Sequence, residues 1–341
     1  MDFISNAAQC SGMNVNLAVV GLGRVGTIHA RNAFRANGIN LKCLVDTDLE
    51  KAVTFAEELN CDATSDFQSV LDDPEINAVL VGTPTLTHYD YVKQALLNGK
   101  DVFAEKPLGV DVDQIDDCYQ LAKERGKILF LAFQRRFDPA FSELIQASRS
   151  GQLGTVQFVR STSRDSPMPS IDYLKTSCGI FHDCLVHDLD MICQVLDEYP
   201  VEVHTHAHCF NPEIAAINDV DTVLVSMKFA SGAIGSIEVS RRSNYGYDQR
   251  LEALGSEGMY EVRNPTSDSL RRSSDGGAQA SPIAFSFPQR YRVAYNEELI
   301  AFGRCVAERL PSPVTHEQSR LNFLIAEAME ESLKNGAPVR L

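Results

Sequence analysis

Three side chains in this sequence are of the types needed for proton and charge chemistry. Asp183 and His187 are four residues apart, so on a helix they share one face, about one turn apart. A carboxylate at that spacing can orient the imidazole and stabilise its protonated form, and a histidine of ordinary pKa exchanges protons near neutrality. Exposed helix partners often show the same spacing. Lys106 follows the apolar run Val102–Ala104 and Glu105, and Pro107 comes directly after it.

A glycine-rich segment upstream gives Lys106 its setting. Residues 21–26 read G-L-G-R-V-G and follow the apolar stretch Leu17–Val20. A G-x-G-x-x-G segment that follows a strand and opens a helix is typical of dinucleotide binding. We expect the first glycine to form the tight turn, the second to let backbone approach a pyrophosphate, and the third to pack helix on strand. The expected cofactor contacts here are Gly21, Gly23, Arg24, Val25 and Gly26. An ordinary glycine turn is the alternative.

Asp46 indicates which dinucleotide would bind. It ends the next apolar run, about 20 residues past Gly26, where a carboxylate bonds a ribose hydroxyl. Its charge would repel the extra phosphate of NADP, and Thr47 and Asp48 supply no arginine in compensation. The sequence therefore predicts NAD. The alternative is a helix cap at Asp46 or Asp48.

The segment 83–88, T-P-T-L-T-H, follows another apolar run and lies at the same predicted sheet edge. We expect it to border the nicotinamide together with the segment around Lys106. The candidate cofactor contacts are Thr83, Pro84, Thr87, His88, Glu105 and Lys106. A simple turn with a helix cap at Thr85 or Thr87 explains the same residues equally well.

Apolar runs and amphipathic stretches alternate over residues 14–136. This alternation predicts βαβ units and a doubly wound parallel sheet covered on both faces, an α/β Rossmann domain. The expected strands are 17–20, 41–45, 78–81, 102–104 and 128–133, and the expected helices are 25–36, 49–59, 87–97 and 112–125. Ligands of such sheets bind outside the carboxyl edges of the strands, where Lys106 would lie.

The pattern changes over residues 137–341. Consecutive strand-like runs predict a mostly antiparallel open sheet in an α+β domain. The expected strands are 156–163, 201–210, 222–229, 233–240, 250–255 and 259–262, and the expected helices are 139–148, 181–196, 295–308 and 316–335. Residues 271–281 are rich in Ser, Gly and Ala and predict a mobile loop, and 1–13 predict a disordered lead.

Composition limits the classes of function. The 341 residues carry a formal charge of -15, which argues against a nucleic-acid surface. No apolar run approaches the ~20 residues of a membrane helix, so we expect no membrane partner. The nine cysteines are scattered, and the first basic residue is Arg24. These features favour reduced thiols and a cytoplasmic protein.

Three motifs in order resemble the glucose-fructose oxidoreductase/inositol dehydrogenase/MocA (Gfo/Idh/MocA) family: the glycine segment, Glu105-Lys106-Pro107, and Asp183 with His187. The resemblance covers nearly the whole chain after Met13. Within the family it is most similar to inositol 2-dehydrogenases, through the segments 137–139, 163–165 and 245–250. It implies a Rossmann domain, an open-sheet second domain, usually a tetramer, and NAD-dependent oxidation of a ring secondary alcohol in polyol metabolism. The implied reaction converts myo-inositol to 2-keto-myo-inositol (scyllo-inosose).

The family's catalytic group maps onto Lys106, Asp183 and His187. His187 would accept the hydroxyl proton while Asp183 holds its ring, and Lys106 would stabilise the charge developing on the substrate oxygen. The candidate substrate contacts are Lys106, Arg135, Asp165, Tyr173, Asp183, His187 and Tyr245. Arg135, Asp165, Tyr173 and Tyr245 could equally be packing or surface residues.

Other interpretations stay open. Related cyclitol or sugar dehydrogenases act on scyllo-inositol, D-chiro-inositol, glucose or xylose, some relatives are NAD-dependent glycosidases, and others are non-catalytic NAD-binding regulators. Relatives usually have two glycines at Cys178-Gly179 and a bulky residue other than histidine at His182, so the pocket here differs. We expect no metal. His204, His206 and His208 alternate on one strand face, and the sequence favours a solvated or interface face over a ligand set.

Overall fold

The computed structural model describes residues 14–341, so the expected disordered lead at 1–13 lies outside the described residues. Contacts divide the chain into two compact units. Unit 1 contains residues up to 137 together with 293–321, and unit 2 contains 138–292 together with 322–341. The expected second domain spanned 137–341 without interruption, whereas residues 293–321 pack within unit 1.

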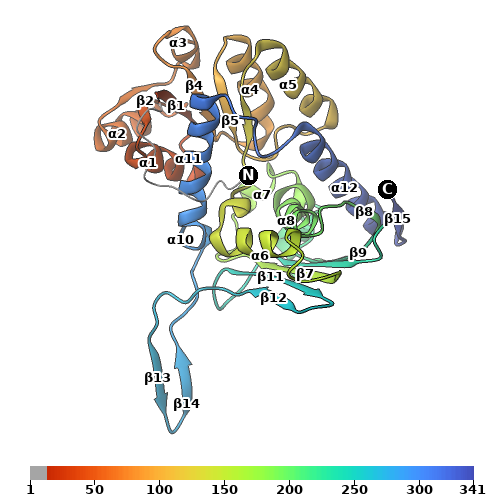
Figure 1. Cartoon of the computed structure of the whole chain (residues 1–341). Coiled ribbons are helices and arrows are strands. Elements are labelled where there is room, and N and C mark those ends of the chain that lie inside the picture. The colour runs from red at the N-terminus through yellow and green to blue at the C-terminus, as the bar shows by residue number, and fades with distance from the viewer. Residues whose placement is uncertain (1–13) are drawn as a thin grey trace. The chain divides into compact units, whose positions relative to one another are not determined.

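Unit 1 is built on a six-stranded parallel sheet (Figure 1). The strand order β3-β2-β1-β4-β5-β6 reverses direction between β1 and β4, as in doubly wound nucleotide-binding sheets. β1, β4 and β5 are short and almost wholly buried, which explains their continuous apolar sequences. Their bounds are β1 (Val15–Val20), β2 (Ile39–Val45), β3 (Asp62–Thr64), β4 (Ala78–Val81), β5 (Asp101–Ala104) and β6 (Leu129–Leu131).

Helices connect these strands and cover both faces of the sheet. The connections on either side of the reversal run in opposite directions, so right-handed crossovers place α1 and α2 on one face and α4 and α5 on the other. The helices are α1 (Arg24–Arg35), α2 (Leu49–Leu59), α3 (Phe67–Asp72), α4 (His88–Leu97) and α5 (Val112–Arg125). The doubly wound sheet expected over 14–136 is confirmed.

The late helix α11 (Arg292–Glu308) joins unit 1 through aromatic packing. Phe302 makes edge-to-face contacts with Phe103 of β5 and Phe130 of β6, with ring centroids 5.6 and 5.8 Å apart. Tyr295 meets the buried ring of His29 on α1 in the same manner, at 5.5 Å. Apolar burial of this kind explains why 293–321 belong to the first unit despite their place in the sequence.

A carboxyl group lies in the interior of unit 1. Glu298 on α11 is fully buried, and Glu105 bonds the Nε2 atom of His29 at 2.8 Å. Burial raises the pKa of Glu298 well above its usual range, and the negative charge of Glu105 adds to the effect. The backbone N–H of Phe133 and the charge of Arg136 oppose it. The folded protein therefore favours the protonated form of Glu298 more strongly than the unfolded chain does.

Unit 2 contains a seven-stranded mixed sheet in the order β12-β11-β7-β10-β9-β8-β15. β7 and β10 pair in parallel and every other pairing is antiparallel, which confirms the mostly antiparallel second sheet. The strands are β7 (Val156–Arg164), β8 (Pro200–His208), β9 (Thr222–Phe229), β10 (Ile234–Ser240), β11 (Asp248–Gly255), β12 (Met259–Val262) and β15 (Val339–Arg340).

Burial alternates along the strands of this sheet, as expected when helices cover one face. Every second residue of β9 and β10 is buried, whereas Leu224 and Ile234 on the opposite face are about half exposed. The helices of this unit are α6 (Pro139–Arg149), α7 (Ile171–Leu174), α8 (Val186–Leu196), α9 (Pro212–Ala215), α10 (Phe287–Arg290) and the later part of α12 (His316–Asn335).

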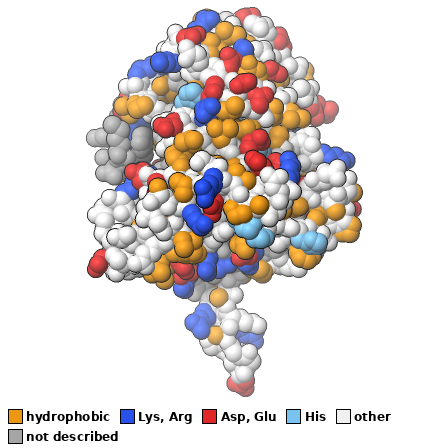
Figure 2. Space-filling view, turned by 90° about the vertical axis from the view of Figure 1, so that its right-hand side faces the viewer, with side chains coloured by type: hydrophobic (Ala, Val, Ile, Leu, Met, Phe, Trp, Pro, Cys, Tyr) orange, Lys and Arg blue, Asp and Glu red, His pale blue; other side chains and the backbone are white. Residues whose placement is uncertain are grey.

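The mobile loop expected at 271–281 is wrong. Residues 271–280 form a two-stranded antiparallel hairpin of β13 (Arg271–Ser274) and β14 (Gly277–Ala280). Figures 1 and 2 show it standing clear of the rest of unit 2, and all eight strand residues are exposed. Gly277, with φ of +100°, supplies the left-handed turn that lets the strands pair.

No helix within residues 14–341 is both long enough and apolar enough to cross a bilayer.

Glu298 predicts that stability falls as the pH rises above the unfolded pKa of this group, about 4.5. Because its folded pKa lies above its unfolded value of about 4.5, the folded state keeps a proton that the unfolded state has lost. This contribution to stability is complete below the unfolded pKa and is lost as the pH rises through the folded pKa. Glu298→Gln stays neutral, so its free energy of unfolding should gain on the wild type by up to ~1.4 kcal/mol per pH unit in that window.

Urea unfolding at pH 5.5, 7 and 8.5 measures this difference. Glu297→Gln changes the half-buried neighbour on the same helix and is the matched control. Parallel pH profiles for the wild type and Glu298→Gln would contradict a protonated Glu298.

Candidate active site

The glycine segment forms the turn between β1 and α1. Gly21 has φ of +87°, a left-handed conformation that favours glycine, and a Cβ atom there would lie 2.7 Å from the carbonyl oxygen of Gly82. At Gly26 a Cβ atom would lie 1.8 Å from the carbonyl oxygen of Gly21. Both positions exclude any side chain, because the turn, the helix and β4 approach one another too closely.

Gly23 has a different environment from its two neighbours. It is exposed at the N-cap of α1, and no described heavy atom lies within 4 Å of an ideal Cβ on it, its chain neighbours apart. A Cβ atom would therefore occupy open space directly before the free N–H groups of the helix. This open position at a helix N-terminus fits the pyrophosphate of a dinucleotide. Arg24 and Val25 begin the helix beside it.

Asp46 lies at the end of β2, next to the glycine turn. Its Oδ2 accepts the N–H of Leu22 at 2.7 Å, and its Oδ1 accepts the N–H of Asp48 at 3.0 Å. Burial alone would raise the pKa of Asp46, but these N–H groups and the Lys51 ammonium, 3.4 Å away, outweigh it and lower that pKa. Asp46 is therefore a fixed anion beside the turn, as the binding of a ribose diol requires.

His88 connects two loops at the carboxyl edge of this sheet. It is buried at the start of α4, with Nε2 2.7 Å from the carbonyl oxygen of Thr83 and Nδ1 2.7 Å from that of Pro107. Burial lowers the pKa of His88, while the two carbonyls and Glu105 act in the opposite direction. The ring contacts backbone on both sides, so it holds the Thr83 and Lys106 loops together.

The remaining residues of the 83–88 segment are more accessible. The hydroxyl of Thr87 donates toward the Thr83 hydroxyl at 2.9 Å and the Pro84 carbonyl at 2.7 Å, which closes the turn. Thr83 and Thr87 are half-buried and Pro84 is exposed. The segment is thus both a cap-like turn and a surface available to a ligand.

Glu105 and Lys106 directly follow β5. The N–H of Glu105 bonds the carbonyl of Val81, which continues the sheet by one residue, and its carboxylate is directed to His29. Lys106 is half-buried. Arg135, another expected contact in unit 1, is buried in the short helix Gln134–Phe137. The structure thus brings the expected cofactor residues to the carboxyl edge of β1, β2, β4 and β5.

In unit 2, Asp183 lies in a π-helical turn, Phe181–Leu185, that leads into α8. Single π-helical turns within helices often mark functional sites. Its Oδ1 accepts the hydroxyl of Tyr173 at 2.8 Å, and its Oδ2 accepts the Nη1 atom of Arg241 at 2.5 Å. Burial and the Asp183 charge raise the pKa of Tyr173, which therefore stays a donor. Asp183 itself is held as a carboxylate by two donors.

His187 follows on α8 and is also buried. The helix is fixed to β7 by Asp188, which is fully buried and accepts the hydroxyls of Ser161 at 2.5 Å and Ser163 at 2.6 Å. These bonds lock the rotation of the first turn of α8. The helical turn that carries His187 is consequently fixed to the sheet of its own unit.

The sequence reasoning did not identify Arg241. The guanidinium is fully buried, and besides Asp183 it contacts Asp219 at 3.2 Å and the thiol of Cys184 at 3.4 Å. A signal was present in the sequence: Ile237, Val239 and Arg241 alternate, so the arginine continues the buried face of β10.

The other expected substrate contacts of unit 2 fall into two groups. Asp165 is half-buried after β7, and its Oδ2 lies 3.8 Å from the thiol of Cys184, next to Asp183. Tyr245 belongs to a separate network, in which its hydroxyl donates to Asp248 at 2.6 Å and accepts from Arg164 at 2.7 Å. Asp165 and Tyr173 therefore gather at Asp183, and Tyr245 is held apart by its own partners.

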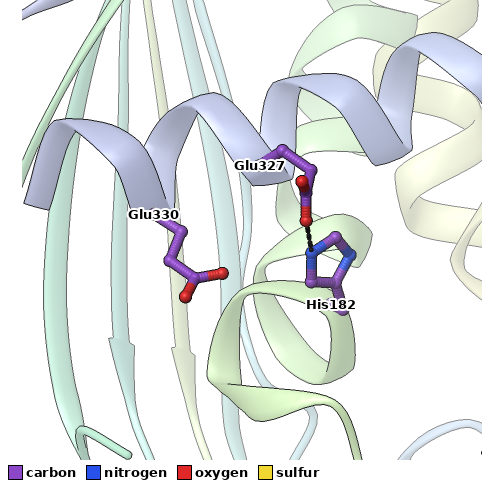
Figure 3. A group of neighbouring side chains, drawn as sticks. All are labelled: His182, Glu327 and Glu330. Carbon is purple, nitrogen blue, oxygen red and sulfur yellow. Dashed lines mark hydrogen bonds and ion pairs between the residues drawn. The ribbon is translucent and has the colours of Figure 1, made fainter. Parts of the chain in front are cut away.

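His182, the unusual residue before Asp183, is buried against α12. Its Nε2 atom lies 3.1 Å from Glu327 (Figure 3). The His182 ring also packs on Phe323, with centroids 4.5 Å apart. Glu330 lies close by, and the three ligand-type atoms are within 4.8 Å of one another. The contact between His182 and Glu327 fastens the π-helical turn to α12.

The structure also shows the conformation of Cys178 and the arrangement of the histidines of β8. Cys178 has φ of +64°, so it occupies a left-handed conformation that a glycine would adopt without steric cost. His204 and His206 lie on one face of β8 with ring centroids 4.4 Å apart. Within residues 14–341 the histidines of β8 do not belong to any group of three potential metal ligands.

Comparison with known proteins agrees with this geometry. The model of an oxidoreductase family with an NAD-binding Rossmann fold matches residues 15–133, and that of the GFO/IDH/MocA C-terminal domain matches 141–261. The chain is 36% identical over 329 residues to a myo-inositol 2-dehydrogenase of Thermotoga maritima, covering 96% of this chain and 98% of the relative.

Two further proteins are similar over nearly the full length. A scyllo-inositol 2-dehydrogenase (NAD(+)) of Bacillus subtilis is 36% identical over 330 residues, covering 96% of each chain. The crystal structure of a myo-inositol dehydrogenase of Corynebacterium glutamicum superposes with a TM-score of 0.91 at 32% identity, covering 96% of this chain and 99% of the other. The glycine turn, the Asp46 carboxylate and these matches together identify the chain as a member of the GFO/IDH/MocA family of NAD-dependent oxidoreductases.

Proposed function

We propose that this protein oxidises a ring secondary alcohol with NAD, and that its substrate is myo-inositol, which becomes 2-keto-myo-inositol. The observation that carries the proposal is full-length similarity to inositol 2-dehydrogenases in a chain that retains Lys106, Asp183 and His187. The anionic Asp183, held one helical turn before His187, supports a proton-accepting role for that histidine.

In the proposed reaction, His187 accepts the proton of the reacting hydroxyl. The Asp183 carboxylate keeps the imidazole in orientation and stabilises the imidazolium that forms. The ammonium of Lys106 donates a hydrogen bond to the same substrate oxygen and stabilises the charge that develops on it. Bound NAD supplies the acceptor for the hydride that leaves the carbinol carbon.

The cofactor would lie along the carboxyl edge of the first sheet. The turn from Gly21 to Gly26 would hold its pyrophosphate, Asp46 its ribose, and Thr83, Pro84 and Thr87 the nicotinamide side. His88 and Glu105, whose side chains are engaged with backbone carbonyls and His29, would act by positioning these loops.

The candidate contacts of the polyol are side chains that can recognise hydroxyl groups. Asp165 and Tyr173 are supported by their place beside Asp183. Arg135 and Tyr245 are proposed from the family resemblance, and Tyr245 would have to share its hydroxyl with Asp248 and Arg164. Recognition of several hydroxyls by buried polar groups gives strong selection between stereoisomers.

A second candidate substrate is scyllo-inositol. The relative named scyllo-inositol 2-dehydrogenase (NAD(+)) is as similar to this chain as the relative named for myo-inositol, at 36% identity. D-chiro-inositol, glucose and xylose are further candidates of the same class. The retained Lys106 and His187 weigh against a non-catalytic regulator, and net NADH release from a free polyol would exclude an NAD-dependent glycosidase. We further propose a cytoplasmic homotetramer, from the family resemblance and the scattered cysteines.

The direct test is NADH formation at 340 nm with myo-inositol, scyllo-inositol, D-chiro-inositol, glucose and xylose, each with NAD and NADP. We expect the strongest signal with myo-inositol and NAD. Activity confined to scyllo-inositol would shift the assignment to the second candidate. If NADH binds but no polyol yields NADH, the proposed function is wrong.

Lys106→Ala should separate chemistry from cofactor binding. We expect kcat to fall by about 10²–10³ because the substrate oxygen loses its charged donor, while NADH affinity changes little. Steady-state kinetics and NADH fluorescence titration measure the two effects. Lys123→Ala, an exposed lysine on α5, is the matched control. Turnover that survives in Lys106→Ala would remove this lysine from the mechanism.

Asp46 should control the choice between NAD and NADP. Asp46→Ala removes the repelling carboxylate and leaves Lys51 next to the place of the extra phosphate. We expect the ratio of kcat/KM for NADP to that for NAD to rise by at least about tenfold, or ~1.4 kcal/mol. Asp48→Ala removes a helix cap on α2 instead and should leave the ratio unchanged. An unchanged ratio in Asp46→Ala would place the ribose elsewhere.

A further inference from the structure

We propose that Arg241 is a positioning residue for the reaction: it holds Asp183 as an anion in one orientation, one turn before His187, and thereby sets the pH above which His187 accepts a proton. The inference rests on the proposed function and assigns a role to a residue outside the motifs of the family resemblance. All of the residues involved belong to unit 2.

The contacts of Arg241 are those of a shared counter-ion. The guanidinium is 0% exposed, and it bridges two carboxylates, Asp183 through Nη1 and Asp219 through Nη2. Burial opposes the charge on Arg241, but Cys184, Asp183 and Asp219 raise the pKa of the guanidinium above its ordinary value. A buried arginine of this kind does not release its proton, so it supplies a constant positive charge beside Asp183.

The same contacts restrict how Asp183 can turn. Arg241 engages Oδ2 and the Tyr173 hydroxyl engages Oδ1, so both oxygens are held from different elements. Asp219 completes the arrangement, because its Oδ1 accepts the N–H of Ile180 at 3.3 Å, directly before the π-helical turn. The guanidinium therefore connects the end of β10 to the turn that carries Asp183.

The charges around Arg241 determine how the loss of its guanidinium would shift the pKa of His187. The titratable groups that contact Arg241 or its partners are Tyr173 of α7, Asp183 and Cys184 of the π-helical turn, Asp219 before β9, and Asp165 after β7. His187 follows Asp183 by one turn on α8, and the fully buried Asp188 is its neighbour in the chain. Arg241 and its two carboxylates sum to one negative charge, which favours a proton on His187. Removing the guanidinium makes that sum more negative, and removing the charge of Asp219 makes it zero.

Two variants should consequently shift the pKa of His187 in opposite directions. The general base must be deprotonated, so kcat/KM rises with pH through the pKa of His187. In Arg241→Gln that rise should move to higher pH by about half a unit or more, and in Asp219→Asn it should move to lower pH. A purely structural role would lower the rate in both variants without opposite shifts.

Arg241→Lys separates charge from geometry. It keeps the positive charge but cannot span two carboxylates as the planar guanidinium does. We expect the pH of half-maximal kcat/KM to stay near the wild-type value while kcat falls about tenfold. Arg242→Gln changes an exposed neighbour whose Nε donates to Asn244 of its own loop, and this variant should match the wild type in rate and pH profile.

The pH dependence of His187 carbethoxylation by diethyl pyrocarbonate, resolved by peptide mass spectrometry, gives the same information without any substrate. Opposite shifts in Arg241→Gln and Asp219→Asn support the proposal. Unshifted profiles, or shifts in one direction, overturn it. If Arg241→Gln does not fold, Asp219→Asn and Arg241→Lys decide the question. A wild type that oxidises no polyol refutes the proposed function alone, because the labelling profiles still report on Arg241.

Discussion

A charge buried away from water has to be neutralised or left unformed, and this constraint organises the polar interior of both units. In unit 2, Arg241 can be fully buried only because Asp183 and Asp219 face it. In unit 1, Glu105 pairs with His29, and burial raises the pKa of Glu298, which favours its neutral form. The side chains nearest to the proposed chemistry are therefore held by electrostatic necessity as well as by packing.

The two units meet this constraint in different ways, which correspond to different tasks. Unit 1 presents an open helix N-terminus at Gly23 and two loops linked through the ring of His88, with the fixed carboxylate of Asp46 beside the glycine turn. Such a surface suits a large, anionic and invariant ligand. Unit 2 presents side chains, with Asp183 held by Tyr173 and Arg241. A site of that kind can be altered residue by residue, as the substrates of a family require.

Much of the fold could be predicted, because its elements follow from local patterns. Continuous apolar strands with intervening amphipathic helices indicated the parallel sheet, and alternating burial indicated the second one. The hairpin at 271–280 was missed, since its Ser- and Gly-rich sequence has no apolar alternation and its pairing depends on a turn at Gly277. The place of α11 was missed as well, because its aromatic contacts with β5 and β6 join residues about 200 positions apart.

The amino-acid sequence by itself determined the family and the cofactor class, and it led to the proposal of Lys106, Asp183 and His187 as the reacting side chains, because these inferences depend on residue types at short spacings. Only the tertiary structure decided how those side chains are held. The residues near Asp183 in the sequence do not indicate that Arg241 and Asp219 lie beside it. The fold brings these side chains together across long separations in the chain. Orientation and charge state are properties of these distant contacts, so they emerge only when the chain has folded.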